Sequence, residues 1–454
     1  MKKLLFITLL PAMLLLGVLS AEAADRHVRA GATGSATGND WTNAYPTLPS
    51  NLTRGDTYYI ATGTYPGRTF NTVASGTALI TIKGATAANH GTDTGWSASM
   101  SVSTAEGGTQ ATFTSGLTFN TSYWVFDGVV GPVGSRTTTA YGFKINPVSY
   151  AVRVFNLSSA ITNITISHIS SVAPAGDVEK FFLSTNNETK SVHNVTWSHN
   201  LLNGWSNAQW ATSPGLAMND WLAEYNIILN GYSSAANHGE DINNNYGYLD
   251  RFTIRYNIFE GRSSGTATIV GGLNGPVGTY YIYGNVFKNQ VSGDGTIVCV
   301  HSNARMYIYN NTFANVTGGG SGPYIGGSAS DCILSGEIAN NLLYSMSAAL
   351  GSAASGMTRH YNAYFSTTNT PPSESNIYTT SGNPFRDYAN GNFGLASAVA
   401  TAMPAGLTLP APYDRDITNA LRGADGKWDR GAYANTGGGA DATPPSPPAN
   451  VRVQ

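Results

Sequence analysis

The densest group of titratable side chains in this sequence is His238, Glu240 and Asp241, within the run Asn-His-Gly-Glu-Asp-Ile at positions 237–242. The cluster is informative because Asp, Glu, Lys and Arg make up only 11% of the 454 residues. Carboxylates hold divalent cations such as Ca²⁺, and an imidazole beside them can move a proton. A loop cap or an adventitious cation site is the alternative reading. On one strand, adjacent acids point to opposite faces, which argues against a paired-carboxylate role unless a bulge intervenes.

A short pattern that ends in asparagine recurs along the second half of the chain. The third and fifth positions before each asparagine are mostly apolar, as Ile254 and Ile308 illustrate, and this period of two indicates a strand with one buried face. The seven asparagines, 21 to 31 residues apart, are Asn200, Asn226, Asn257, Asn285, Asn311, Asn341 and Asn362. Because no helix pattern separates these strands, each can stack on its own copy one coil later, as in a parallel β-helix. The register also predicts an internal ladder of asparagine amides.

Positions two and four before each asparagine must then point outward. Coils stack about 4.8 Å apart, so Tyr281 would lie over Tyr307 and Tyr283 over Tyr309, as a four-ring platform. Aromatic faces with hydroxyl rims suit sugar rings. The alternative is an aromatic ladder that a long loop covers.

Basic residues are expected near the acidic cluster, counting back from the asparagines. Lys180 lies in a comparable part of a coil two before Glu240, and Arg305 lies in the turn of a later coil. Because coil lengths vary, their proximity is a hypothesis. Arg255 neighbours Glu224 in the outward column, where a surface ion pair is the simpler interpretation.

Several segments carry a family resemblance. They are Asp25–Val28, Asn39–Tyr45 and Arg54–Tyr65 at the start, the early rungs Leu79–Gly84 and Tyr123–Gly128, and the closing Asp429–Tyr433. With these segments, residues 25 to 434 resemble the secreted right-handed parallel β-helix proteins of the pectate-lyase-like superfamily. The resemblance specifies fold far better than function.

Two chemistries are implied by this resemblance. A lyase for uronic-acid polymers neutralises the substrate carboxylate with Ca²⁺ or Arg and removes the adjacent proton with a base, whereas a hydrolase uses two carboxyl groups. We expect Glu240 and Asp241 to bind a cation or the substrate carboxylate, with His238 or Lys180 as the base. Arg255 or Arg305 would supply the counter-charge, and the tyrosine platform would form a subsite. The aspartate pair with Gly-His-Gly of pectin hydrolases and the Arg-x-Pro-x-x-Arg of the main pectate lyase family are both absent.

Composition narrows the class of protein. Lys and Arg number 24 against 26 Asp and Glu, for a net charge of −2, so there is no basic field for nucleic acid. The composition of helical bundles is absent. A monomer that binds a polysaccharide or cell-surface glycan is expected.

The two ends of the chain differ from its body. Lys2 and Lys3 precede an apolar run at 4–18, and Ala21-Glu-Ala23 completes a signal peptide at 1–23, which implies a secreted, periplasmic or cell-surface protein. No other segment is apolar enough to span a membrane. Residues 24–435 would form the β-helix domain. Residues 436–454 read as a Gly/Pro-rich linker and the start of a truncated fibronectin-III-like module.

The only two cysteines are Cys299 and Cys332, which we expect in neighbouring coils. A disulfide and two buried thiols both remain open. The function predicted from all these features is polysaccharide cleavage, with a lyase ahead of a hydrolase. The alternative is a non-catalytic extracellular rod that binds glycans, and the sequence does not identify the polysaccharide.

Overall fold

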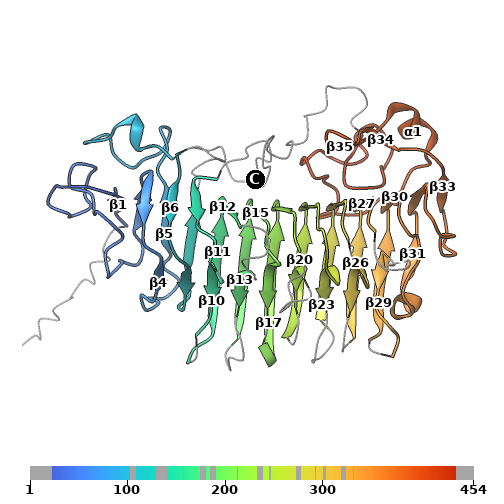
Figure 1. Ribbon diagram of the computed structural model, residues 1–454, viewed down its shortest axis with the longest axis horizontal. Coiled ribbons are helices and arrows are strands. Elements are labelled where there is room, and N and C mark those ends of the chain that lie inside the picture. Colours follow the sequence, from blue (N-terminus) through green and yellow to red (C-terminus); the bar gives the residue numbers. More distant parts are fainter. Residues whose placement is uncertain are drawn as a thin grey trace, which may run out of the picture.

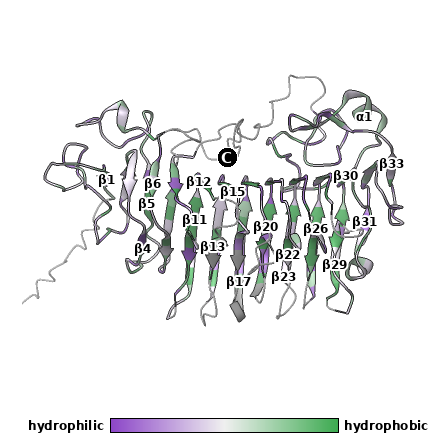
Figure 2. Ribbon diagram, viewed as in Figure 1, coloured by the Kyte–Doolittle hydropathy of each residue, from purple (hydrophilic) through white to green (hydrophobic). Residues whose placement is uncertain are grey.

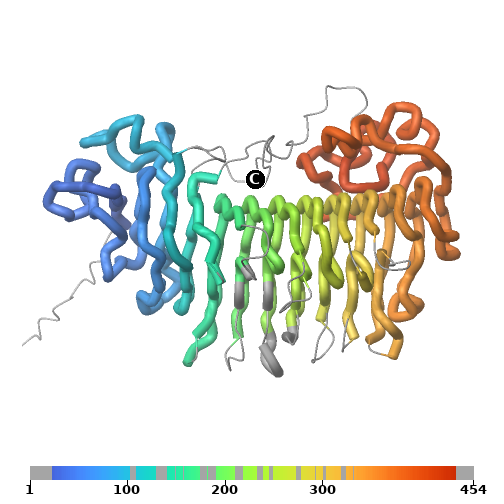
Figure 3. Tube along the Cα trace, in the orientation of Figure 1, coloured from blue at the N-terminus to red at the C-terminus, as the bar shows by residue number. Residues whose placement is uncertain are grey.

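The computed structural model describes residues 23–435, apart from residues 103–108, 129–140, 149, 157, 174–179, 185–190, 212, 233–238, 245–246, 272–277, 292, 300–302, 318–323 and 331. These residues form an elongated stack of coils whose strands lie side by side along the long axis (Figure 1, Figure 3). Three parallel sheets run the length of the stack. The structure therefore confirms the predicted parallel β-helix.

Each coil contributes up to three strands, one to each sheet. Sheet A contains β1 (Asp25–Val28), β2 (Thr57–Ile60), β5 (Ile80–Gly84), β8 (Trp124–Asp127), β11 (Ile161–Ser167), β14 (Val192–Ser198), β17 (Ser213–Glu224), β20 (Gly247–Arg255), β23 (Gly278–Tyr283), β26 (Ala304–Tyr309), β29 (Leu334–Ala339) and β31 (Thr358–His360). Sheet B contains β3 (Gly63–Tyr65), β6 (Ala111–Phe113), β9 (Phe143–Ile145), β12 (Ile169–Val172), β15 (Leu201–Asn203), β18 (Ile227–Leu229), β21 (Ile258–Glu260), β24 (Val286–Lys288), β27 (Thr312–Ala314), β30 (Leu342–Tyr344), β32 (Ala363–Phe365) and β33 (Tyr378–Thr380). Sheet C contains β4 (Arg68–Phe70), β7 (Leu117–Phe119), β10 (Val152–Val154), β13 (Lys180–Ser184), β16 (Asn207–Ala211), β19 (Glu240–Asn243), β22 (Ala267–Gly271), β25 (Gly295–Cys299) and β28 (Ile325–Gly326).

The apolar columns of the repeat form the core. In sheet A, Ile254 pairs with Ala223 on one side and with Ile282 on the other, so equivalent repeat positions lie directly above one another. Ile254, Ile282 and Ile308 are all fully buried. Hydrophobic and hydrophilic residues mix along the strands of the coils (Figure 2). The predicted register of sheet A is confirmed.

The seven asparagines form the predicted ladder in the turns between sheets A and B. All seven side chains are fully buried. At each of the six steps, Nδ2 of one asparagine donates to Oδ1 of the next at 3.0 Å. The same Oδ1 also accepts the backbone N–H of the preceding asparagine. The ladder thus provides partners for turn amides that water cannot reach.

The residue before each ladder asparagine has a left-handed backbone conformation. Gly284 occupies this position in one coil with φ +65°, and Tyr225 and Tyr256 occupy it in others with φ of 55° and 61°. Such a conformation costs a non-glycine residue roughly 1–2 kcal/mol. We attribute its persistence to the ladder hydrogen bonds, which hold the turn in one shape.

A carboxylate ends the ladder. Oε1 of Glu374 accepts the backbone N–H of Asn362 at 2.9 Å, and its Oε2 accepts Nδ2 of Asn362 and Oη of Tyr364, both at 3.0 Å. The last asparagine has no further coil to bond, and Glu374 takes the place of the missing neighbour.

After the last coil, the chain folds back along the stack. This C-terminal segment contains the antiparallel pair β34 (Phe385–Asp387) and β35 (Asn392–Leu395) and the short helix α1 (Ser397–Ala402). It lies beside the later coils, near β27 and β30 (Figure 1). Met403 and Trp428 of the segment pack with Tyr283 and Tyr309 of sheet A in one apolar cluster. Nη1 of Arg430 donates to the carbonyl of Asn362 at 3.0 Å, which fastens the segment to the final coil.

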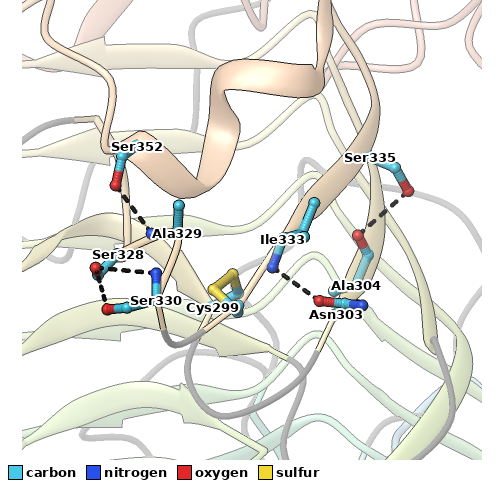
Figure 4. Close-up of a disulfide and its surroundings, with 10 residues drawn as sticks. Cys299, Asn303, Ala304, Ser328, Ala329, Ser330, Ile333, Ser335 and Ser352 are labelled. Atoms are coloured by element: carbon cyan, nitrogen blue, oxygen red, sulfur yellow. Dashed lines mark hydrogen bonds between the residues drawn. A yellow bond between two sulfur atoms is a disulfide. The ribbon is translucent and has the colours of Figure 1, made fainter.

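Cys299 and Cys332 form a disulfide, with Cα atoms 6.2 Å apart (Figure 4). The bond links the end of β25 to the turn before β29, and the structure thereby decides between the two alternatives. The remaining helical elements are the short η1 (Ala98–Met100) and η2 (Ser352–Gly356). Across the described part of the chain, no helix is both long and apolar enough to cross a membrane. The predicted signal peptide lies almost wholly outside the described residues, and the predicted linker lies entirely outside them.

Candidate functional site

Glu240 and Asp241 open strand β19 in sheet C, and both are buried, with 2% and 1% of their surface exposed. They make different contacts, as expected for adjacent strand positions. Ile242, the next residue, points into the core. The two carboxylates therefore do not act as a matched pair in this structure.

Asp241 is neutralised by an ion pair with Arg262, whose side chain is also buried. The guanidinium donates further to the carbonyls of Ser264 at 3.3 Å and Ser206 at 3.5 Å. Burial raises the pKa of Asp241, and the positive charge of Arg262 opposes that shift. Removing one partner of such a pair leaves a buried charge uncompensated, which is strongly destabilising. The role of Asp241 in this structure is therefore structural, because its ion pair holds the turn that carries Arg262.

Glu240 sits among amide side chains. Its Oε2 accepts Nδ2 of Asn207 at 3.0 Å and Nδ2 of Asn243 at 2.8 Å. We call these three residues the Glu240 cluster. The Oδ1 atoms of Asn207 and Asn243 are buried and have no hydrogen-bond partner, and the same is true of Oε1 of Gln209. Buried oxygens without partners are rare in proteins and call for an explanation.

Asn207, Gln209 and Asn243 are not among the site residues predicted from the sequence. A signal was present, because the next coils place apolar residues in the same row: Asn243 pairs with Val270, and Val270 with Val298. Polar amides at positions where the repeat is otherwise apolar mark this part of sheet C as unusual.

Lys180 belongs to the same sheet as the Glu240 cluster. Its backbone pairs with that of Asn207, one coil from Glu240, which agrees with the position expected from the repeat. The side chain of Lys180 and the whole of His238 lie outside the described residues. Their proposed role as base stays a prediction.

The two arginines that were expected to supply a counter-charge lie on sheet A, a different face of the stack. Arg255 donates to Oε2 of Glu224 through Nε at 2.7 Å and Nη2 at 2.6 Å, and to Oη of Tyr283 at 2.9 Å. Burial alone would lower the pKa of Arg255, but the interactions with Glu224 and Tyr283 together outweigh burial, and the net pKa is raised. Arg305 is exposed on β26. The structure therefore does not bring Arg255 or Arg305 to the sheet that carries Glu240.

The four tyrosines divide into an open pair and a covered pair. Tyr281 and Tyr307 stack with ring centroids 5.5 Å apart and planes 9° apart, and both are half-buried. Tyr283 and Tyr309 are buried beneath Tyr413, whose ring contacts theirs edge-on at 4.8 and 4.9 Å. The expected four-ring platform is therefore corrected to a pair of open rings. Sequence reasoning could not place Tyr413, which arrives from the C-terminal segment.

A carboxylate closes the covered end of this row. Glu337 accepts a hydrogen bond from Oη of Tyr309 through Oε2, and its Oε1 contacts Nε2 of His360. Burial and the neighbouring Glu337 raise the pKa of Tyr309. The phenol of Tyr309 therefore stays protonated at neutral pH and acts as a donor.

In the part of the chain with described positions, no three His, Cys, Asp or Glu side chains gather closely enough to hold an ion on their own. Amide oxygens are cation ligands too, so the Glu240 cluster is the relevant candidate.

Comparison with known proteins gives a likeness in fold. No protein-family model matches the sequence, and no curated protein matches it. Among solved structures, pectate lyase Pel9A is similar over 91% of this chain and 97% of its own, with 13% identity and a TM-score of 0.47. The PL6 family alginate lyase AlyGC is similar over 83% of this chain and 56% of its own, with 13% identity and a TM-score of 0.36. At 13% identity these likenesses concern the fold alone.

Proposed function

We propose that this protein is a secreted enzyme that cleaves a polysaccharide, with its chemistry at the Glu240 cluster and β-elimination ahead of hydrolysis. The observation that supports it is the buried Glu240 carboxylate between two amides whose oxygens have no partner. An unsatisfied buried polar group costs about 1–3 kcal/mol. The cost would be recovered when a bound ligand supplies the missing partners.

A divalent cation would give the amide oxygens of Asn207 and Asn243 a partner beside the Glu240 carboxylate. The two ends of an asparagine amide differ only in which atom is oxygen and which is nitrogen. A half-turn of Asn207 and of Asn243 would direct both Oδ1 atoms toward the oxygen of Glu240 that now accepts their Nδ2 groups. In Asn207 the half-turn would also replace the 2.8 Å hydrogen bond from Nδ2 to the carbonyl of Glu240. One carboxylate and two amide oxygens are ligands that Ca²⁺ accepts. Ca²⁺ would there neutralise the carboxylate of a uronic-acid substrate.

Elimination is favoured over hydrolysis because of Asp241. A hydrolase of the usual kind needs two carboxyl groups on either side of the scissile bond. The carboxylate next to Glu240 is already paired with Arg262, so it is not available as the second group. Elimination needs a single base beside a neutralised substrate carboxylate. Lys180, two coils before Glu240 in sheet C, and His238 are our candidates for that base.

The test is product formation on a panel of acidic polysaccharides, with Ca²⁺ or with a chelator. We expect ultraviolet absorbance of an unsaturated product from wild type with Ca²⁺, and a loss of at least 100-fold in rate for Glu240→Gln. Glu224→Gln, a matched carboxylate change on sheet A, should keep wild-type activity. Ca²⁺ alone should raise the melting temperature of wild type and not of Glu240→Gln, because a ligand of the native state stabilises it.

New reducing ends without the unsaturated product would indicate hydrolysis in place of elimination. No product on acidic or neutral polysaccharides would contradict the enzymatic proposal. The second candidate, a non-catalytic glycan-binding rod, would then be preferred. The open Tyr281–Tyr307 pair on sheet A favours that candidate.

A further inference from the structure

The outer face of sheet A carries a shallow depression on the coils that precede the tyrosine pair. Its floor is one column of side chains, in which Val125 pairs with Thr165, Thr165 with Thr196, and Thr196 with Leu222. The column continues through Thr253 and so approaches Tyr281. We call this depression the sheet A groove. It runs along the stack, so equivalent groups recur about every 4.8 Å.

A row of residues with left-handed backbone forms one side of the groove. Asn163, Asn194 and Asp220 have φ of 59°, 50° and 61°. In neighbouring strands these residues lie opposite one another outside the pairing, and the register on either side of them is unchanged. Three successive coils therefore repeat the same left-handed position, and all three side chains line the groove.

This left-handed row presents hydrogen-bond acceptors to solvent. Nδ2 of Asn163 and Nδ2 of Asn194 both donate to Oγ1 of Thr162, at 3.1 and 3.0 Å. Among the described residues, nothing donates to the Oδ1 atoms of these two asparagines. Their amides are thus held in place by Thr162, with one oxygen left for a ligand in each of two successive coils.

The groove is nearly neutral. Among the described residues that line it, Asp220 is the one with a charge, and both of its oxygens accept hydrogen bonds from Arg251, at 2.6 and 2.8 Å. Arg251 also donates to Asp250 at 2.7 Å, so its charge is already compensated. The described lining of the groove therefore offers no unpaired cation to a polyanion such as nucleic acid.

The aliphatic side chains of the groove are spread along its lining. Leu79, with 41% of its surface exposed, joins Val125 and Leu222 along the lining. A protein partner is anchored by large side chains that fill pockets, and this shallow groove offers none. Isolated aliphatic groups between amides and hydroxyls match a sugar polymer, which alternates C–H faces with hydroxyl groups.

We infer that the sheet A groove binds an extended, uncharged polysaccharide chain along the long axis of the molecule, separately from the chemistry at the Glu240 cluster. The oxygens of Asn163 and Asn194 accept sugar hydroxyls, and the hydroxyls of Thr165 and Thr196 bond to the chain between them. The ring face of Tyr281 that is turned away from Tyr307 extends the groove at one end. The enzyme is thereby held on a polymer by a face other than the one that cleaves.

The test is native affinity electrophoresis in gels that contain hydroxyethylcellulose, galactomannan or xyloglucan, with polygalacturonate and alginate as acidic comparators. We expect at least one neutral polysaccharide to retard wild type, and Thr196→Lys to weaken that retardation at least tenfold by filling the groove. Thr358→Lys is the matched control, because it adds the same charge in the same column beyond the groove. It should behave as wild type.

A second variant removes ligand groups without adding bulk. Asn163→Gly with Asn194→Gly keeps a residue that adopts the left-handed conformation readily, and we expect several-fold weaker retardation with unchanged far-ultraviolet circular dichroism. Equal retardation of wild type and both groove variants would overturn the inference. So would retardation by the acidic polymers alone, or by none of the five. Loss of cleavage in Glu240→Gln with normal retardation separates this inference from the proposed function.

Discussion

The asparagine ladder allows one stability prediction to be worked out in detail. We propose to replace Asn285, near the middle of the ladder, with alanine. Its Oδ1 accepts the backbone N–H of Asn257 at 2.9 Å and Nδ2 of Asn257 at 3.0 Å. Its own Nδ2 donates to the carbonyl of Ile254 at 2.9 Å and to Oδ1 of Asn311 at 3.0 Å.

The expected loss in the free energy of unfolding depends on which groups keep a hydrogen-bond partner. Nδ2 of Asn257 retains the carbonyl of Ala223 at 3.0 Å, whereas the backbone N–H of Asn257 loses its acceptor. One buried donor left unsatisfied costs about 1–3 kcal/mol. The other lost bonds add on the order of 1 kcal/mol each, partly offset by remaining partners. We therefore expect Asn285→Ala to lower the free energy of unfolding by about 3–5 kcal/mol.

The assay is urea unfolding followed by circular dichroism, at one protein concentration and one pH. Asn390→Ala, at an exposed asparagine of the β34–β35 turn, is the matched control and should stay within about 0.5 kcal/mol of wild type. Asn285→Asp is a sharper variant, because a carboxylate still accepts from Asn257 but cannot donate to Asn311. A loss below about 1 kcal/mol for Asn285→Ala would refute the view that the ladder holds the turns.

Three other predictions concern the core, the C-terminal segment and the disulfide. Ile308→Asp should prevent stable folding, since it buries an unpaired charge, while Thr358→Asp on the exposed surface of the same sheet should melt like wild type; equal melting of the two would contradict the register of sheet A. Burial raises the pKa of Asp429 to about 6, so the native state holds this proton after the unfolded chain has released it, and stability should fall by about 2–3 kcal/mol as pH rises from about 4 to 6. Asp429→Asn should lack that fall in stability. If the melting temperatures of wild type and Asp429→Asn changed in parallel with pH, the fall would not be due to Asp429. Replacing both Cys299 and Cys332 by serine should cost about 3–4 kcal/mol, as expected for a loop closed over 33 residues; an unchanged urea midpoint would show that the bridge adds nothing to stability.

Features that repeat along the chain were predictable because they depend on local spacing. The period of two before each asparagine identified the buried faces of residues such as Ile254 and Ile308, and stacking of equal coils aligned them. The same repeat predicted the asparagine ladder and the stack of Tyr281 on Tyr307. In a solenoid each coil contacts only its neighbours, so the pattern of one coil determines most of its packing.

The candidate site was less predictable, because it depends on contacts between segments that the repeat does not relate. Sequence position suggested that Arg255 and Lys180 serve one site, but the strands that carry them belong to different sheets. Asp241 was expected to bind a cation, and its partner proved to be Arg262, in the turn of the next coil. Turn lengths between the sheets vary, so counting from an asparagine does not specify which side chains meet.

The sequence by itself determined the class of fold, the register of sheet A and the asparagine ladder, since each rests on short-range periodicity. It also predicts an export signal. Only the tertiary structure decided that Cys299 and Cys332 are joined, that Tyr413 covers Tyr283 and Tyr309, and that Glu240 lies between two amides. The C-terminal segment reaches Tyr283 across more than a hundred residues of chain. Its docking depends on apolar area and shape presented by the finished coils, which no local pattern in the sequence encodes.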